Sequence, residues 1–288
     1  MKEVRLITNL EVWDKFIELS EQGTIFCTSN WLSLYKNDYR IYGYYKGDNL
    51  LGGICGLVAP PYFDSGRDMP LTPFMGVLVA PRNGAKYTSV ISMHNEVTGK
   101  LMDEIVKSYW GISVSNHYTY PDVRPFLWRY YNPRVKYTYV LKLDDKMWDN
   151  FEKDTRYEIS KDTRKVSVSV DIDHFDSLYQ QTFERKSMER PVSSEMIHDV
   201  YTNFKSVLYM TEDGEAGAVF IFDSKRAYYI LGASDGTGSY GLIGFALASL
   251  KESGIKEVDF VGCNSENIAR FKRGFGGILC PYYQCTSF

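Results

Sequence analysis

The sequence has no apolar run long enough to cross a membrane. Its most apolar stretch, residues 50–61, is broken by glycines and prolines and falls short of the roughly 20 residues that a membrane-spanning helix needs. The first residues carry Lys2, Glu3 and Arg5 in place of the apolar core of a signal peptide. We therefore expect a soluble, cytoplasmic protein without a transmembrane segment.

Cysteine and histidine are scarce and scattered. The chain has five cysteines and four histidines, and no Cys-x-x-Cys pair. This pattern disfavours a disulfide framework and a zinc site, so we expect reduced thiols and no metal centre. No Ser/His/Asp or Cys/His arrangement is present either, which argues against a hydrolase and for direct attack on a substrate without a covalent enzyme intermediate.

Positive charge is not in excess. The chain has 33 Lys and Arg residues against 36 Asp and Glu, which gives a formal net charge of −3 and a pI near 5.9. Long-range attraction to nucleic acid or to an anionic membrane is therefore weak. We expect no nucleic-acid partner, with tRNA as the one exception considered below.

What is present is an internal repeat. At 288 residues the chain has about twice the length of a usual domain. In both halves a Ser-led helix is followed by an alternating strand, an Asp-x-x-x-Gly turn and a second strand, and the two copies lie 165 residues apart. We interpret this repeat as two similar domains. The paired positions are Ser29 and Ser194, Asp48 and Asp213, and Gly52 and Gly217.

The second half has the clearer order of elements. The sequence predicts a strand at 166–170, helices at 173–187 and 194–204, three strands within 206–235, a helix at 242–252, a strand at 257–261, a helix at 264–274 and a strand at 278–285. The first half follows this order loosely, with a helix at 97–108 and an insertion at 60–73. The predicted domains are residues 1–143 and 166–288, joined by a linking helix at 144–165.

This order matches the GNAT acyltransferase fold, and three motifs resemble the FemAB-like branch of that superfamily, also described as lipid II glycyltransferase-like. The motif Phe-Lys-x-x-Phe-Gly at 271–276 resembles the terminal signature of the family. The basic segment at 156–166 is similar to the family's linking helix, which runs into the first strand of domain two. The motif Thr-Pro-x-x-Gly at 72–76 is similar to a stretch of its first domain. The resemblance implies an α/β (α+β) protein with two tandem GNAT-like domains, each a mixed, mostly antiparallel sheet flanked by helices.

The resemblance also implies acyl transfer with no tightly bound cofactor, and with acyl-CoA or aminoacyl-tRNA as co-substrate. Two departures bear on the donor. Members that use aminoacyl-tRNA often carry a long helical hairpin, which this chain lacks. The Gln/Arg-x-x-Gly-x-Gly/Ala turn of simple GNAT enzymes is also missing, and residues 235–241 stand at that junction instead.

The glycine-rich loop is the candidate donor site. Gly236, Gly238, Ser239 and Gly241 precede or open a helix, where free N–H groups and the helix dipole favour a phosphate. A tight turn that needs positive φ explains the glycines equally well. Asp235 beside them would repel phosphate, so it either caps the helix or acts as a general base.

Lys272 is the candidate catalytic residue. The resemblance implies that the lysine of this motif faces the acceptor channel, where an ammonium could steady the oxyanion formed when an amine attacks an acyl carbonyl. A surface lysine near a helix C-terminus is the alternative interpretation. The attacking amine must lose a proton, and Asp235 or Glu266 is the candidate base.

The candidate acceptor site includes the end of the helix at 173–187. Phe183, Arg185 and Lys186 lie there, and arginine suits bidentate capture of phosphate or carboxylate. A solvated, charged helix end is the more frequent meaning of such a run. Tyr229 and Phe271 are candidate rings lining the cleft. Along residues 154–164 bases alternate with acids, which predicts a salt-bridged solvent face.

These observations predict an N-acyltransferase. It would transfer an acyl or aminoacyl group to an amine of a sugar-nucleotide, a peptidoglycan precursor or a related envelope metabolite, and the acceptor is expected to be small and anionic. One alternative is a degenerate, non-catalytic acyltransferase that binds a ligand. Another is a tRNA-dependent aminoacyltransferase, which predicts a positive groove and salt-dependent binding.

Overall fold

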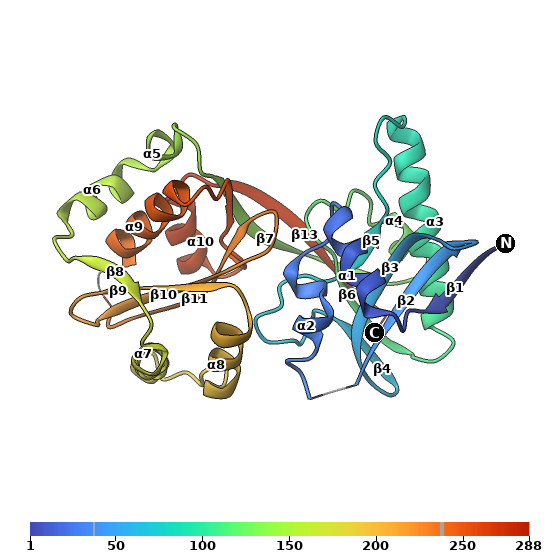
Figure 1. Ribbon diagram of the computed structural model, residues 1–288, viewed down its shortest axis with the longest axis horizontal. Coiled ribbons are helices and arrows are strands. Elements are labelled where there is room, and N and C mark those ends of the chain that lie inside the picture. The colour runs from blue at the N-terminus through green and yellow to red at the C-terminus, as the bar shows by residue number, and fades with distance from the viewer. Residues whose placement is uncertain (37, 237–238, 288) are drawn as a thin grey trace. The chain divides into compact units, whose positions relative to one another are not determined.

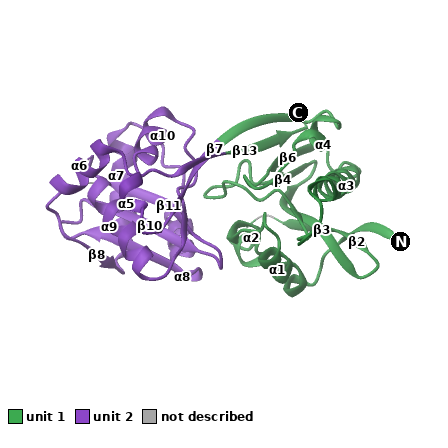
Figure 2. Cartoon of the chain, turned by 90° about the horizontal axis from the view of Figure 1, so that it is seen from above, with its two compact units in different colours: residues 1–136, 281–288 green, residues 137–280 purple. Residues whose placement is uncertain are grey.

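The chain passes between two compact units twice, in strands β7 (Asn132–Lys142) and β13 (Ile278–Thr286). The computed structural model describes residues 1–36, 38–236 and 239–287 (Figure 1). Unit 1 comprises residues 1–136 and 281–288, and unit 2 comprises residues 137–280 (Figure 2). Each unit is a mixed, mostly antiparallel sheet flanked by helices, as predicted.

This division differs from the predicted bounds of 1–143 and 166–288. The last residues belong to unit 1 because β13 pairs there with β6 (Gly111–Ser115), with Cys285 opposite Val114. Cys285 is completely buried in the core of that unit. The predicted linking helix is two short helices, α5 (Met147–Asn150) and α6 (Lys153–Lys161), and both belong to unit 2.

Unit 1 has helices on both faces of its sheet. Adjacent residues of a strand point to opposite faces. A methyl group at Gly52 would meet Val97, whereas one at Gly53 would meet Trp13, so the helices that carry these residues lie on opposite faces of β3. The elements are β1 (Lys2–Leu6), α1 (Leu10–Leu19), η1 (Ile25–Cys27), α2 (Ser29–Leu32), β2 (Tyr39–Lys46), β3 (Asn49–Ala59), β4 (Tyr62–Ser65), β5 (Val77–Val79), α3 (Tyr87–Ile105), β6 and α4 (Arg124–Leu127).

Unit 2 has the sheet order β7-β12-β11-β10-β9-β8. All neighbours are antiparallel except β11 and β12, which run parallel and pair at Ala227 with Val258 and at Tyr228 with Asp259. The elements are β8 (Val166–Ser169), α7 (Ile172–Arg185), α8 (Ser194–Asn203), β9 (Ser206–Thr211), β10 (Ala216–Phe222), β11 (Ala227–Ser234), α9 (Ser239–Glu252), β12 (Glu257–Asp259) and α10 (Glu266–Arg273). The predicted repeat is present as α2-β2-β3 and α8-β9-β10.

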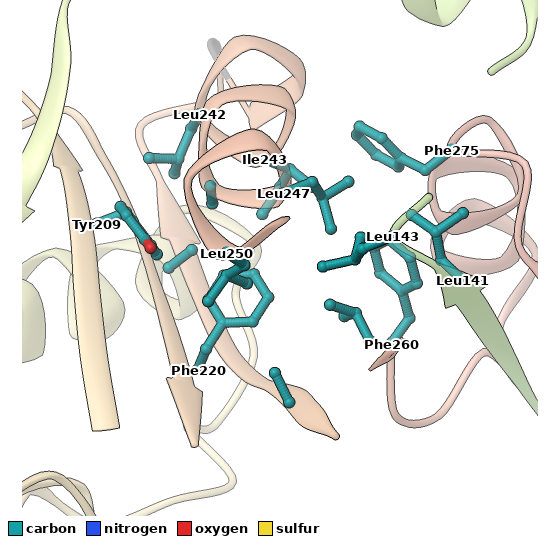
Figure 3. Packing of buried hydrophobic residues seen from close by; sticks show 14 of the residues in the cluster. Leu141, Leu143, Tyr209, Phe220, Leu242, Ile243, Leu247, Leu250, Phe260 and Phe275 are labelled. Atoms are coloured by element: carbon teal, nitrogen blue, oxygen red, sulfur yellow. The ribbon is translucent and has the colours of Figure 1, made fainter. Parts of the chain in front are cut away.

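The core of unit 2 lies between its sheet and α9. Figure 1 shows α9 and α10 on one face of the sheet and α7 and α8 on the other. Leu242, Ile243 and Leu247 of α9 pack with Phe220 of β10 and with Phe260 (Figure 3). All of these side chains are at most 2% exposed, and burying each stabilises the fold by about 1.5–3 kcal/mol. This core fixes the start of α9, where the pocket described next is found.

Candidate functional site

A pocket of about 640 Å³ lies in unit 2 beside the start of α9. Three segments form it: the end of α6 with the residues after it, the turn into α9 with the first turn of that helix, and α10. Its described lining residues are Glu158, Lys161, Asp162, Thr163, Arg164, Gly236, Ser239, Tyr240 and Phe271. Smaller pockets, of about 440 and 330 Å³, lie in unit 1. Of these three pockets, only the one in unit 2 is lined by candidate site residues.

Asp162 and Arg164 form a forked ion pair on one side of this pocket. The Arg164 Nε and Nη2 atoms donate to the two carboxylate oxygens of Asp162 at 2.9 and 2.8 Å. The Arg164 guanidinium holds the pKa of the Asp162 carboxyl below its usual range, and Asp162 in turn raises the pKa of Arg164. The side chains are only 10% and 22% exposed, so this pair is not the open solvent face that the alternating charges predicted.

The glycines of α9 give room to other parts of the chain. A methyl group at Gly241 would lie 2.5 Å from Oδ2 of Asp162, and one at Gly244 would lie 3.0 Å from Ile159 of α6. A methyl group at either position would overlap a neighbouring side chain, and such overpacking destabilises a fold. Gly241 was predicted to cradle a donor phosphate, but in the structure its open side is filled by the Asp162 carboxylate.

Lys272 lies on α10 next to the pocket residue Phe271, but its ammonium group points into the protein. The side chain is 8% exposed, and Nζ donates to the backbone carbonyls of Phe260 and Gly262 at 2.6 and 2.7 Å and also to that of Val261. An ammonium has three N–H donors, and here all three are taken. In this arrangement the three donors of Lys272 point to backbone carbonyls, whereas the predicted role requires one of them to face an oxyanion.

The Lys272 ammonium explains the unusual backbone after β12. Val261 and Gly262 both have left-handed φ values, +47° and +57°, and this brings three successive carbonyls to one Nζ atom. A branched residue such as valine adopts this region only when its surroundings enforce it. The predicted strand 257–261 therefore ends at Asp259, and Lys272 is a positioning residue for the turn that follows.

Asp259 is a buried carboxyl group on which two cations, Arg226 and Lys272, act to lower the pKa. It is completely buried, and its Oδ1 accepts hydrogen bonds from the Thr138 hydroxyl at 2.5 Å and from the Val261 N–H at 2.8 Å. Its Oδ2 has no hydrogen-bond partner among the residues that the structure describes. Burial raises the pKa of Asp259 to about 6 and lowers the pKa of Lys272 to about 8, because both charged forms lose hydration.

An aromatic cluster connects the pocket to the buried ammonium group of Lys272. Phe271 and Tyr240 line the pocket and contact each other edge to face at 4.9 Å, and both contact Phe275. Phe275 stacks on Phe260, which contacts the ring of Tyr229, and the Lys272 Nζ lies 5.7 Å from that ring. Tyr229, predicted to line the cleft, therefore lies behind the pocket wall, where burial raises its pKa.

The end of α7 reaches the turn into α9 through one residue. Arg185 donates from Nη2 to the Ser234 carbonyl at 2.8 Å, and its guanidinium lies 3.6 Å from a methyl group placed on Gly236. Lys186 lies over the ring of Phe183 at 5.7 Å, and neither residue lines the pocket. Arg185 thus supports the turn, whereas Phe183 and Lys186 are not brought to the pocket.

The remaining predicted residues divide between the pocket and the surface. Gly236, Ser239 and Phe271 line the pocket, whereas Gly238 lies outside the described residues. Asp235 is exposed beside Gly236, and its charge acts on Arg164. Glu266 is exposed in the first turn of α10.

Sequence reasoning missed Asp162 and Tyr240 as pocket residues. The Asp-x-Arg spacing of residues 162–164 could have indicated the ion pair, because the same spacing forms a forked ion pair between Asp122 and Arg124 in unit 1. There Arg124 donates from Nε to Oδ1 at 2.8 Å and from Nη2 to Oδ2 at 2.7 Å.

Comparison with known proteins gives structural matches only. No family model matches the sequence, and no curated protein matches it significantly. FemX matches with a TM-score of 0.68 at 14% identity, over 98% of this chain and 96% of FemX. The chain has the FemAB-like tandem GNAT fold. L-PGS from Bacillus licheniformis matches with a TM-score of 0.56 at 13% identity, over 96% of this chain and 91% of that one.

A tandem GNAT protein from the clavulanic acid biosynthesis pathway also matches, with a TM-score of 0.55 at 8% identity, over 100% of this chain and 99% of that one. These matches confirm the predicted FemAB-like resemblance and the predicted fold class. No helix in the described part of the chain is long and apolar enough to span a membrane. Among the described residues, no group of three or more His, Cys, Asp or Glu side chains is arranged to hold a metal ion.

Proposed function

We propose that the chain is an N-acyltransferase that uses the unit 2 pocket as its donor site. One observation carries this proposal: a pocket of about 640 Å³ lies beside the first turn of α9, in a chain with the acyltransferase fold of the FemAB-like proteins. The acyl group of the donor would lie against the aromatic wall of Tyr240 and Phe271, and the amine would approach from the side of the turn at Gly236.

The reaction needs few groups from the protein. The neutral amine attacks the acyl carbonyl, a C–N bond forms, and the bond from the carbonyl carbon to the carrier breaks, with the electron pair leaving on the carrier's sulfur or oxygen. The amine loses one proton, and Asp235 is the better placed of the two candidate bases because it adjoins the pocket residue Gly236. Lys272 contributes indirectly, by holding the turn after β12 and through it the aromatic wall.

The donor is an acyl-CoA or an aminoacyl-tRNA, and the acceptor is an amine on a small anionic envelope precursor, such as a sugar-nucleotide or a peptidoglycan precursor. Arg185 is the residue we propose to attract the acceptor's charge, because it is exposed and stands at the turn beside the pocket. We propose a cytoplasmic location on the same grounds, since activated donors of both classes are made there.

The test is a transfer assay with matched variants. The protein is incubated with acetyl-CoA or with alanyl-tRNA and with a UDP-linked muramoyl pentapeptide that carries a free lysine amine, and products are weighed by mass spectrometry. We expect an amide product from one donor and its loss in Ser239→Trp, which fills the pocket. Ile278→Ala, at a 63% exposed position, is the control that should keep activity. Binding of a donor without product in any amine panel would favour the non-catalytic alternative.

A further inference from the structure

The sheet of unit 2 ends in a free edge at β8. Among the described residues this strand pairs only with β9, and it is the last strand in the sheet order. The Glu212 N–H donates to the Lys165 carbonyl at 2.9 Å, so the backbone of Lys165 faces β9. Because this direction alternates along an antiparallel strand, the backbone N–H and C=O groups of Val166, Val168 and Val170 point away from β9. They offer a ladder to a further strand.

Apart from its short length, this edge has none of the features by which proteins protect a free strand. Such edges usually carry charged residues or proline, or are twisted by a bulge. The strand at the other end of the sheet order, β1, has the sequence KEVRL, in which charged residues predominate. Residues 166–170 are instead valine and serine in alternation, and the side chains of Val168 and Val170 are 60% and 84% exposed. An edge of this kind is typical of a strand that pairs with another chain.

The sequence of this edge is complementary to itself. Residues 165–171 read Lys-Val-Ser-Val-Ser-Val-Asp, and residues 166–170 have the same order in either direction. When two copies pair antiparallel about Val168, each valine lies opposite a valine and each serine opposite a serine. The same register puts Lys165 of each copy opposite Asp171 of the other. Opposite charges and β-branched pairs in these positions stabilise a sheet.

The two charged residues are available for this pairing. Both side chains are exposed, and neither has an ion-pair partner within the described part of the chain. Asp171 caps α7 by accepting the His174 N–H at 2.9 Å through Oδ1, which leaves its Oδ2 for a cation. The register also fits the backbone, because Val166, Val168 and Val170 face the edge and would form the hydrogen-bonded pairs. Backbone direction and charge therefore favour the same alignment.

We propose that two copies of this chain pair antiparallel through β8, centred on Val168, so that the unit 2 sheet of one copy continues into that of the other. The paired segment is short and the interface is small, so the dimer forms reversibly and depends on concentration. The pairing does not depend on the proposed acyl transfer.

Sedimentation equilibrium over a concentration series tests the pairing. We expect the wild type to form a dimer, and Val168→Lys, which sets two ammonium groups opposite each other, to raise the dissociation constant by about ten-fold or more. Ile278→Lys is the matched control, because Ile278 is 63% exposed but lies on β13, which has β6 and β7 on its two sides in the sheet order. This control should dimerise like the wild type.

Two charge variants test the register. Lys165→Glu sets a glutamate against Asp171, and Asp171→Lys sets a lysine against Lys165, so each variant alone should dimerise more weakly than the wild type. An equal mixture of the two should recover the dimer, because the new glutamate of one copy then meets the new lysine of the other. Circular dichroism checks that Asp171→Lys, which loses the cap of α7, is folded.

Three results would overturn the proposal: a wild type that stays monomeric at every concentration, a Val168→Lys chain that dimerises as strongly as Ile278→Lys, or a mixture of folded charge variants that recovers no dimer. If Asp171→Lys does not fold, Lys165→Glu decides the register alone, and wild-type dimerisation by that variant contradicts it.

Discussion

Replacing Lys272 by methionine tests whether this lysine positions the backbone or serves the chemistry. Methionine keeps most of the length of the side chain and removes the ammonium, which donates to three backbone carbonyls and faces the charge of Asp259. At 8% exposure, water can replace few of these bonds. Three carbonyls would lose their donor, and Asp259 would lose one of the two cations, Arg226 and Lys272, that lower its pKa.

The expected cost follows from these contacts. A hydrogen bond to a charged group contributes about 1.5–3 kcal/mol, and removing the ammonium breaks three of them, offset in part by the desolvation that the ammonium no longer suffers. Each kcal/mol lowers the melting temperature of a domain of this size by about 2–8 °C. We therefore expect Lys272→Met to lower the free energy of unfolding by about 3–5 kcal/mol and to speed hydrogen exchange at Val261 and Gly262.

Urea unfolding and hydrogen exchange measure this effect, with Lys161→Met as the matched control. Lys161 lines the pocket but is exposed, so its substitution should change stability by less than about 0.5 kcal/mol. The reasoning is refuted if Lys272→Met is as stable as Lys161→Met and exchanges at wild-type rates, since the ammonium would then be free to act on a ligand.

Three further predictions concern unit 2. Gly241→Ala should destabilise the wild type by about 1–3 kcal/mol, because the added methyl group meets the Asp162 side chain. In an Asp162→Gly chain the same substitution should stabilise the fold by up to about 1 kcal/mol, because alanine favours a helix over glycine. Urea unfolding of the wild type, the two single variants and the double variant checks this change of sign. Because burial raises the pKa of Asp259 to about 6, this group contributes about 3 kcal/mol of stability below about pH 4, and the contribution is lost as the pH rises through 6. Urea unfolding midpoints between pH 4 and 7 should show this fall in the wild type but not in Asp259→Asn. Phe275→Ala, at a completely buried position among Phe151, Phe260 and Phe271, should cost about 3–5 kcal/mol, and calorimetry should find no such loss in Ile278→Ala.

The order of elements in unit 2 could be predicted because it depends on local patterns. Apolar periodicity and turn residues lie within short windows, so helices 173–187 and 194–204 were found within two residues of α7 and α8. Helix α3 was predicted only from residue 97, because its first ten residues include few buried apolar side chains. The return of β13 to unit 1 was missed, since strand pairing between distant segments leaves no local signal.

The residues of the candidate site differ in how far the sequence reveals their surroundings. Gly236, Ser239 and Phe271 were singled out because a glycine turn before a helix and an aromatic residue on the last helix are visible in the sequence, and all three line the pocket. The contact of Asp162 with Gly241 joins segments far apart in the chain, so it leaves no local signal. The sequence alone also does not distinguish a glycine that makes room for a side chain from one that makes room for a ligand. The direction of the Lys272 ammonium depended on left-handed backbone at Val261, which valine rarely adopts.

The proposed acyl transfer is tested most directly by weighing the acceptor after incubation with each donor. We expect the UDP-linked muramoyl pentapeptide to gain the mass of one donor acyl group, joined by an amide bond, with the wild-type chain and not with Ser239→Trp. An acceptor of unchanged mass with acetyl-CoA, with alanyl-tRNA and across a panel of amines would contradict the account.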